Sequence, residues 1–315
     1  MKHILASTLG GTMALALSLS FVGTAKATEG NGNSYPLGVE TNMAGLMLPE
    51  GLNLLLYYSH YSASDSKDNS GHNNANLARY HIKTDSVALR FSYVWPGVRW
   101  LGANVETRLA LVVPTIDLTL DVARPAPLFN LDRGGTTTDI GDTSFAPILL
   151  GWHGKTVHQT AGVESFLPTG RYDKNEPVNA GRNYYQIAPF YALSWFPNEH
   201  WESSAKLRYA INTKNDDTDY RSGDELTLEF SGGYRLTPRL SVGLNGYWYH
   251  QMTDDELDGD AVNGNGNRGQ VTAIGPYAMF RVSKDFALVA KWQEEFDAKN
   301  KSEGSRIWLQ ARLPF

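Results

Sequence analysis

Histidine and acidic side chains, together with glycine-rich turns, are the features of this chain that could support catalysis or ligand binding. Seven of its eight histidines are scattered between His60 and His250, without the i, i+4 spacing on a helix that is typical of a zinc enzyme. The chain has no cysteine, which excludes disulfides, thiolate metal sites, thiol nucleophiles and a lipoprotein anchor. We therefore predict no catalytic residue, no metal site and no cofactor.

Two loop motifs imitate ligand sites. The stretch from Gly264 to Gly269 matches G-x-G-x-x-G, but it precedes a strand pattern instead of following a strand and opening a helix, so a dinucleotide site is not expected. Asp254, Glu256 and Asp258 resemble the start of a calcium loop, yet the twelfth position is Asn265 and lacks the bidentate carboxylate. We interpret both stretches as solvated loops and leave open weak bridging of divalent ions to lipopolysaccharide phosphates.

The N-terminus has the pattern of an export signal. Lys2 supplies a positive start, residues 5–22 contain an apolar run, and Ala25-Lys26-Ala27 is a cleavage site, which predicts a signal peptide over residues 1–27. Its removal takes away two basic residues and no acidic one, so the mature chain has 26 basic and 33 acidic residues and a net charge of −7. Such an acidic chain is a poor ligand for nucleic acid.

The elements that must position any site are strands. Residues 223–236 and 239–251 alternate apolar with polar or small side chains, which is the period of a strand with two different faces. The mean hydropathy of −0.35 argues against a bundle of membrane helices. The pattern predicts twelve strands, at residues 51–62, 82–95, 99–113, 142–153, 156–167, 184–196, 199–211, 223–236, 239–251, 270–282, 286–296 and 304–315.

The connections between these strands alternate in length. Short turns are expected at 96–97, 154–155, 197–198, 237–238 and 283–285. Long polar loops are expected at 62–81, 123–141, 168–183, 212–222, 252–269 and 297–303. Short turns on one side and long loops on the other are typical of an antiparallel up-and-down β-barrel in the outer membrane of a Gram-negative bacterium. The strands of a secreted β-sandwich, the alternative fold, would also alternate apolar and polar residues, but that fold does not explain the asymmetry of the loop lengths.

One face of the strands suits lipid. Aromatic residues recur near the strand ends, where their rings fit the headgroup level: Tyr93, Trp95, Trp195, Trp201, Tyr234, Trp248, Tyr277 and Trp292. The last strand ends in Phe315 with apolar residues at every second position, which resembles the assembly signal of outer-membrane barrels. The expected partners are therefore outer-membrane lipid, lipopolysaccharide and the barrel-assembly machinery.

The opposite face carries charges that would line the lumen. The pattern places inside the barrel Arg90, Glu106, Arg108, Glu164, Glu202, Lys206, Arg208, Glu229, Arg235, Lys291, Glu295, Arg306 and Arg312. Eight of these are basic and five are acidic. Two interpretations remain open, a polar permeation path with a modest cationic excess and a set of ion pairs that only stiffen the wall.

A barrel of twelve strands encloses more space than its own side chains fill. Residues 28–50, between the signal peptide and the barrel domain at 51–315, are either a disordered periplasmic leader or an insert that narrows the lumen. Inward aromatic residues either contact solute or pack against this insert. The candidate contacts are Met43, Met47, Tyr57, Tyr61, Phe145, Phe166, Tyr247, Tyr249 and Trp308.

Short motifs, about one per hairpin, carry a resemblance to a known family. They include Gly141-Asp142-Thr143, residues 167–170 (LPTG), Gly246-Tyr247 and Ile274-Gly275-Pro276. In this order they resemble the meta-pathway phenol-degradation family of outer-membrane proteins, over residues 45–315. The resemblance implies an outer-membrane channel for small hydrophobic or aromatic compounds and no enzymatic activity. The alternatives are a barrel enzyme such as a phospholipase-like hydrolase, for which we find no Ser–His constellation, and a structural or adhesive barrel.

Overall fold

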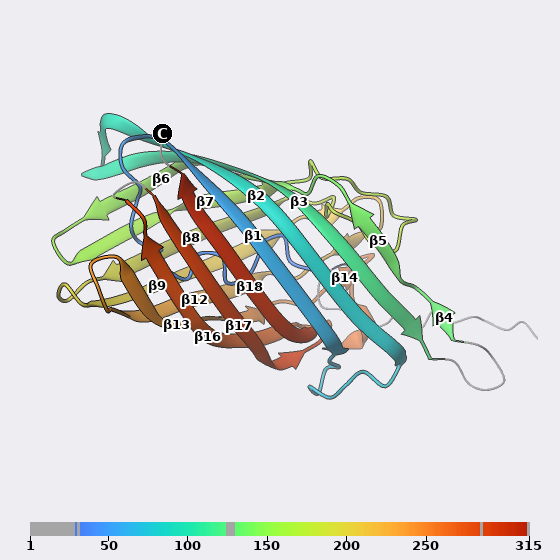
Figure 1. Ribbon diagram of the computed structural model, residues 1–315. Helices are drawn as coiled ribbons and strands as arrows, with labels where there is room; N and C mark the ends of the chain where they lie inside the picture. The colour runs from blue at the N-terminus through green and yellow to red at the C-terminus, as the bar shows by residue number, and fades with distance from the viewer. Residues whose placement is uncertain (1–28, 30–31, 124–129, 284–285, 314–315) are drawn as a thin grey trace, which may run out of the picture.

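The computed structural model describes residues 29, 32–123, 130–283 and 286–313. Within them a closed antiparallel barrel forms, in which each strand pairs with its neighbours in the chain and β1 pairs with β18 (Figure 1). The wall strands are β1 (Gly51–Ser66), β2 (Leu77–Trp100), β3 (Ala103–Val122), β6 (Thr143–His153), β7 (Val157–Leu167), β8 (Gln186–Trp195), β9 (Trp201–Asn212), β12 (Glu225–Arg235), β13 (Leu240–Gln251), β16 (Gln270–Arg281), β17 (Ala287–Lys299) and β18 (Ser302–Leu313). The predicted barrel of twelve strands is confirmed. The predicted signal peptide and Phe315 lie outside the described residues.

The two faces of the wall differ as the alternation predicts. In β12, Glu225, Thr227 and Glu229 are buried in the lumen while the intervening leucines are on the outer face. Aromatic side chains near the strand ends are exposed on the outer face, among them Trp195, Trp201 and Trp292. A barrel of this kind hydrogen-bonds all of its strand edges, which is the condition for crossing a bilayer. Among the described residues, no helix is long and apolar enough to cross a membrane.

The long connections contain short strands of their own. These are β4 (Leu131–Asp132), β5 (Gly135–Thr138), β10 (Lys214–Asn215), β11 (Tyr220–Arg221), β14 (Glu256–Leu257) and β15 (Asp260–Ala261), with a 3₁₀ turn at Val262–Gly264. β10, β11, β14 and β15 form a small separate sheet, and β4 and β5 pair with β3. We call this side of the barrel the long-loop end and the opposite side the short-turn end.

The β2–β3 hairpin is longer than the sequence predicts. At the long-loop end Leu77, which lies in a segment that we expected to be a loop, pairs with Val122, nine residues past the predicted end of its strand. A polar strand can still hydrogen-bond its neighbour beyond the lipid. At the short-turn end the predicted turn at 96–97 is wrong. The strands continue past an irregular stretch to a turn at Leu101 and Gly102, whose φ angles of 52° and 76° suit a two-residue hairpin loop.

Two aromatic residues lie on the face opposite to the predicted one. The ladder of β6 shifts register between Phe145 and Leu149, around Pro147, so the alternation changes parity there. Ser144 therefore points into the lumen, where its hydroxyl donates to Glu164, and Phe145 lies on the outer face. Tyr277, expected in the outer aromatic belt, is buried in the lumen with its hydroxyl 2.5 Å from Glu202.

Candidate functional site: a segment threaded through the lumen

The residues before β1 run through the lumen from one end to the other. At the long-loop end, the Glu29 carboxylate accepts hydrogen bonds from Thr218 (2.7 Å) and Asn215 (2.8 Å). At the short-turn end, Asn53 donates to the carbonyl of Pro49, directly before β1 (2.8 Å). We call residues 32–50 the lumen segment, and Figure 1 shows it as the blue coil behind the front strands. Of the two positions considered for residues 28–50, the described part therefore lies inside the barrel.

Glu40 binds the lumen segment to the barrel wall at mid-height. Its carboxylate forms ion pairs with Arg90 of β2, Arg108 of β3 (3.0 Å) and Lys206 of β9. β3 and β9 are separated by β6, β7 and β8 in the sheet order, so the cations reach Glu40 from different sides of the lumen. The Glu40 side chain is 15% exposed, and three charge-assisted contacts to one largely buried carboxylate form a strong attachment.

Backbone contacts fix the segment on both sides of Glu40. Lys291 of β17 donates to the carbonyls of Gly38 and Val39, each at 2.8 Å. Nearer the short-turn end, the NH of Gly45 donates to Ser194 (3.0 Å) and its carbonyl accepts from Thr160 (3.1 Å). A Cβ atom at Gly45 would lie 2.4 Å from the carbonyl oxygen of the wall residue His158, so only glycine allows this approach.

Two apolar clusters pack the segment against the wall. Above Glu40, Tyr35 and Leu37 lie among lumen side chains that include Phe166 and Tyr247. The Tyr35 ring is also covered by the cations of Lys206 (4.8 Å) and Arg208 (4.5 Å). Below Glu40, Met47 packs with Val94, Ala146, Leu149, Phe190 and Ala192. The lumen is therefore filled on one side by the segment.

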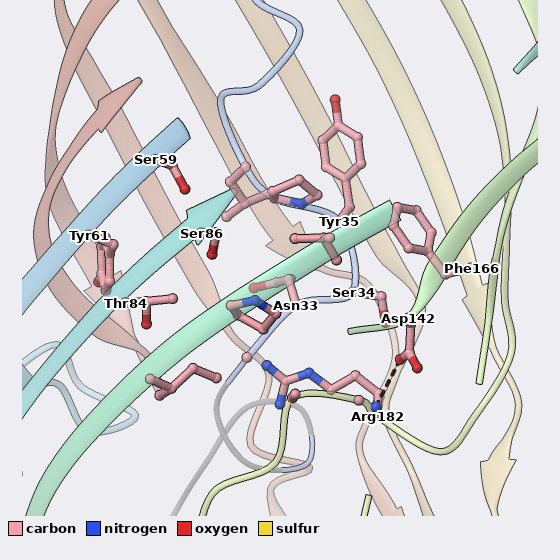
Figure 2. A pocket seen from close by; sticks show the side chains of 18 of the residues that line it. Asn33, Ser34, Tyr35, Ser59, Tyr61, Thr84, Ser86, Asp142, Phe166 and Arg182 are labelled. Atoms are coloured by element: carbon pink, nitrogen blue, oxygen red, sulfur yellow. Dashed lines mark hydrogen bonds between the residues drawn. The ribbon is translucent and has the colours of Figure 1, made fainter. Parts of the chain in front are cut away.

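A cavity of about 440 Å³ remains between the lumen segment and the β1–β3 wall. Its β2–β3 side is mainly apolar and includes Ile82, Ala88, Ala110, Val112, Pro114, Ile116 and Leu118. Figure 2 shows Tyr61 and Thr84 on one side of this space and Tyr35 and Phe166 on the other. The deepest residues on this wall are Tyr57, Arg90 and Ala110, so the cavity extends from the long-loop end down to the level of Glu40. Its volume is in the range of small-molecule pockets.

Two charged groups support the mouth of the cavity at the long-loop end. The carboxylate of Asp142 accepts from the backbone NH groups of Gly170 (3.0 Å) and Arg182 (2.8 Å), and Figure 2 shows the second of these bonds. Burial raises the pKa of Asp142 above its ordinary value. Lys301, in the β17–β18 turn, donates to Asn33 (2.7 Å), and burial lowers the pKa of its ammonium to about 8.

The predicted lumen charges face the interior, but their partners differ from the expected cross-strand pairs. Arg108 pairs with Glu106 (3.0 Å) and Arg208 lies 3.9 Å from Glu164. Most other acids instead accept hydrogen bonds from tyrosines: Glu229 from Tyr35, Glu202 from Tyr277, and Glu295 from both Tyr61 and Tyr247. Arg312 donates to Asn53, while Arg235 lies at the end of β12 at the short-turn end.

Apart from Phe145 on the outer face, the aromatic and methionine residues expected to contact solute either line the cavity or pack in the lumen. Tyr57, Tyr61, Phe166 and Trp308 line the cavity. Tyr247, Tyr249 and Met47 are buried in the packing clusters, and Met43 lies within the lumen segment at a φ of 51°. In the part of the chain that the structure describes, no three His, Asp or Glu side chains come together in a way that could hold a metal ion.

Sequence reasoning missed the residue that organises the lumen, Glu40. It lies in a stretch without strand periodicity, so the alternation that located the wall residues could not assign it a position. The excess of basic over acidic residues on the predicted lumen face was the available signal, because cations in a confined space need a counter-charge. An acidic residue in the segment before the first strand was a candidate for that role.

Comparisons with known proteins place the fold. No curated protein matches the chain. An outer-membrane channel of Pseudomonas putida F1 is similar in structure, with a TM-score of 0.72 and 17% identity over 89% of this chain and all of that one. The transport unit of the autotransporter AIDA-I from Escherichia coli has a TM-score of 0.50 and 8% identity, over 87% of this chain and 95% of that one. The model of the family described as "Putative MetA-pathway of phenol degradation" matches residues 63–311, and the chain belongs to this family.

Proposed function

We propose that the protein is an outer-membrane channel through which small hydrophobic compounds, aromatic ones among them, enter the cell. The observation that supports this most directly is the cavity, because it joins an apolar β2–β3 wall to a mouth at the long-loop end. The family to which the chain belongs and the fold of the similar channel agree with this role. The long loops then face the outside of the cell and the short turns face the periplasm.

The lumen segment makes transport of large hydrophilic solutes unfavourable. It occupies the lumen beside the cavity, and its polar contacts hold it against the wall on that side. An apolar solute, in contrast, covers the apolar surface of β2 and β3, and this contact favours its binding because apolar surface is removed from water. We therefore propose that the part of the lumen nearest the long-loop end selects solutes by apolar contact. We also propose that lipopolysaccharide surrounds the barrel.

A pair of neighbouring substitutions tests this function. Val112 lines the cavity, whereas Val113 is 45% exposed on the lipid face of the same strand. Val112→Trp should fill part of the cavity and lower uptake of radiolabelled toluene or phenol by at least roughly fivefold in a deletion strain that carries the variant gene. Val113→Trp should leave uptake unchanged, because tryptophan is well tolerated at the membrane surface. Unchanged uptake of every hydrophobic compound in the deletion strain itself would overturn the proposal.

A further inference from the structure

Arg306 of β18 is a lumen cation that has no polar partner within the described part of the chain. It lines the cavity, yet among the described residues its side chain forms no ion pair and no hydrogen bond, and its buried Nε has no acceptor. The guanidinium lies over the ring of Tyr61, its cross-strand neighbour, at 4.7 Å. An arginine that lies over a ring and forms no hydrogen bond within the described residues can receive an acceptor from outside the chain.

Two acidic groups of the same cavity, Glu295 and Glu40, already have donors. Glu295, on the neighbouring strand, accepts from Tyr247 (2.5 Å), Tyr61 (2.7 Å) and the NH of Gly304 (2.9 Å). Glu40 is shared by three cations, as described above. Neither carboxylate lies within ion-pair distance of Arg306, so the positive charge of this side chain is not neutralised by a direct contact with the described chain.

Trp308 adds a second unused donor on the same face of β18. It is two residues from Arg306, it also lines the cavity, and its ring lies 5.9 Å from the guanidinium. The side chain is 3% exposed, and its indole Nε1 is buried with no acceptor among the described residues. Buried donors are normally satisfied, so two orphaned donors side by side in one cavity point to a missing acceptor.

We propose that Arg306, supported by Trp308, binds the carboxylate of a hydrophobic acid, so that the preferred solutes are aromatic or aliphatic monocarboxylates. The guanidinium fork matches a carboxylate with two parallel hydrogen bonds. The apolar body of the solute would lie along Ile82, Ala88 and Val112 across the cavity, and Tyr61 would support the head group. This inference rests on the proposed function, and it adds a charged head group to the expected substrate class.

Matched ligands test the carboxylate directly. Benzoate and benzyl alcohol share a ring and differ in the head group, and their binding to the purified full-length protein in detergent is measured by calorimetry. We expect the wild type to bind benzoate at least roughly tenfold more tightly than benzyl alcohol, as a charge-assisted hydrogen bond would give. Arg306→Met should abolish this preference and change the affinity for benzyl alcohol less than twofold. Arg281→Met, which removes an exposed arginine at the far end of β16, is the control for net charge.

The outcomes separate this inference from the proposed function. Equal binding of the two ligands by the wild type, or equal loss of both in Arg306→Met, overturns the carboxylate site and leaves uptake of hydrophobic compounds standing. Binding of neither ligand contradicts both. Heat-modifiable migration on gels checks folding, and Arg306→Gln, which keeps a polar side chain of similar length, replaces the methionine variant if that one does not fold.

Discussion

Removing the charge of Glu40 should release the lumen segment from the wall. In Glu40→Gln, the cations of Arg90, Arg108 and Lys206 lose their shared carboxylate. Breaking a buried ion pair by removing one partner costs about 3–5 kcal/mol. The glutamine keeps one acceptor oxygen and the site is not fully sealed, so we take the lower value, about 3 kcal/mol. This corresponds to a change of roughly 100-fold in the ratio of released to bound segment.

Single-channel recording in planar bilayers measures that ratio. A released segment widens the lumen, so Glu40→Gln should enter a larger-conductance state roughly 100 times as often as the wild type. Glu50→Gln is a matched control, because Glu50 belongs to the same segment but is 42% exposed and lies 3.7 Å from Arg99. Exposed pairs contribute about 0–1 kcal/mol, so this variant should behave as the wild type. If Glu40→Gln and the wild type open equally often, Glu40 does not hold the segment and the reasoning fails.

Three further predictions follow from the same contacts. Deletion of residues 28–48 should raise the single-channel conductance several-fold, and an unchanged conductance would show that the segment does not narrow the path. Gly45→Val should release the segment at its lower attachment, because a Cβ atom there would lie 2.4 Å from the carbonyl oxygen of His158. Gly232→Val, where nothing lies within 4 Å of the added atom, is the control, and increased protease cleavage of the segment in Gly45→Val alone is the expected result. The pKa of Lys301 is about 8 in the folded protein and near 10.5 when the lysine is hydrated, so the unfolded state binds more protons between these values. The free energy of unfolding in urea should therefore rise between pH 8 and 10.5, by at most about 1.4 kcal/mol per pH unit. Lys301→Met should lack this rise. If the variant shows a rise of equal slope, the pH dependence belongs to other groups.

The wall of the barrel could be predicted from the sequence because a strand with one face in lipid and one in a polar lumen must alternate. Residues 225–235 show this directly, since every inward position there is polar or glycine. The prediction failed where the alternation itself is interrupted. The register shift around Pro147 moved Phe145 to the outer face, and a bulge cannot be located by counting every second residue. The prediction for Tyr277 failed for another reason, because a tyrosine suits an outer aromatic belt and can equally donate a hydrogen bond to a buried carboxylate.

The lumen segment could be suspected from the sequence but not placed. The polar contacts that hold it against the wall include residues between about 50 and 270 positions away, such as Arg90, Lys206 and Gln310, and no local pattern encodes such pairs. The same is true of the cavity, whose apolar wall lies on β2 and β3 while its opposite side is formed by the segment. Individual wall residues could be assigned to the lumen, but the lack of a polar partner for Arg306 among the described residues follows only from the three-dimensional contacts of its neighbours, such as those of Glu295.

If solute passes along the cavity, the position of Glu40 at its deepest level indicates which part of the channel would have to move. A solute that reaches Arg90 and Tyr57 meets the ion pairs of Glu40 before it can continue toward the short-turn end. The wall strands are joined by continuous hydrogen-bonded ladders, whereas the segment is attached by side-chain contacts and individual backbone bonds. Displacing the segment therefore disrupts fewer cooperative interactions than opening the wall. If passage depends on this displacement, Glu40→Gln should raise uptake in the wild-type background and have a much smaller effect beside Val112→Trp. Additive effects of the two substitutions would instead mean that cavity and segment belong to separate paths.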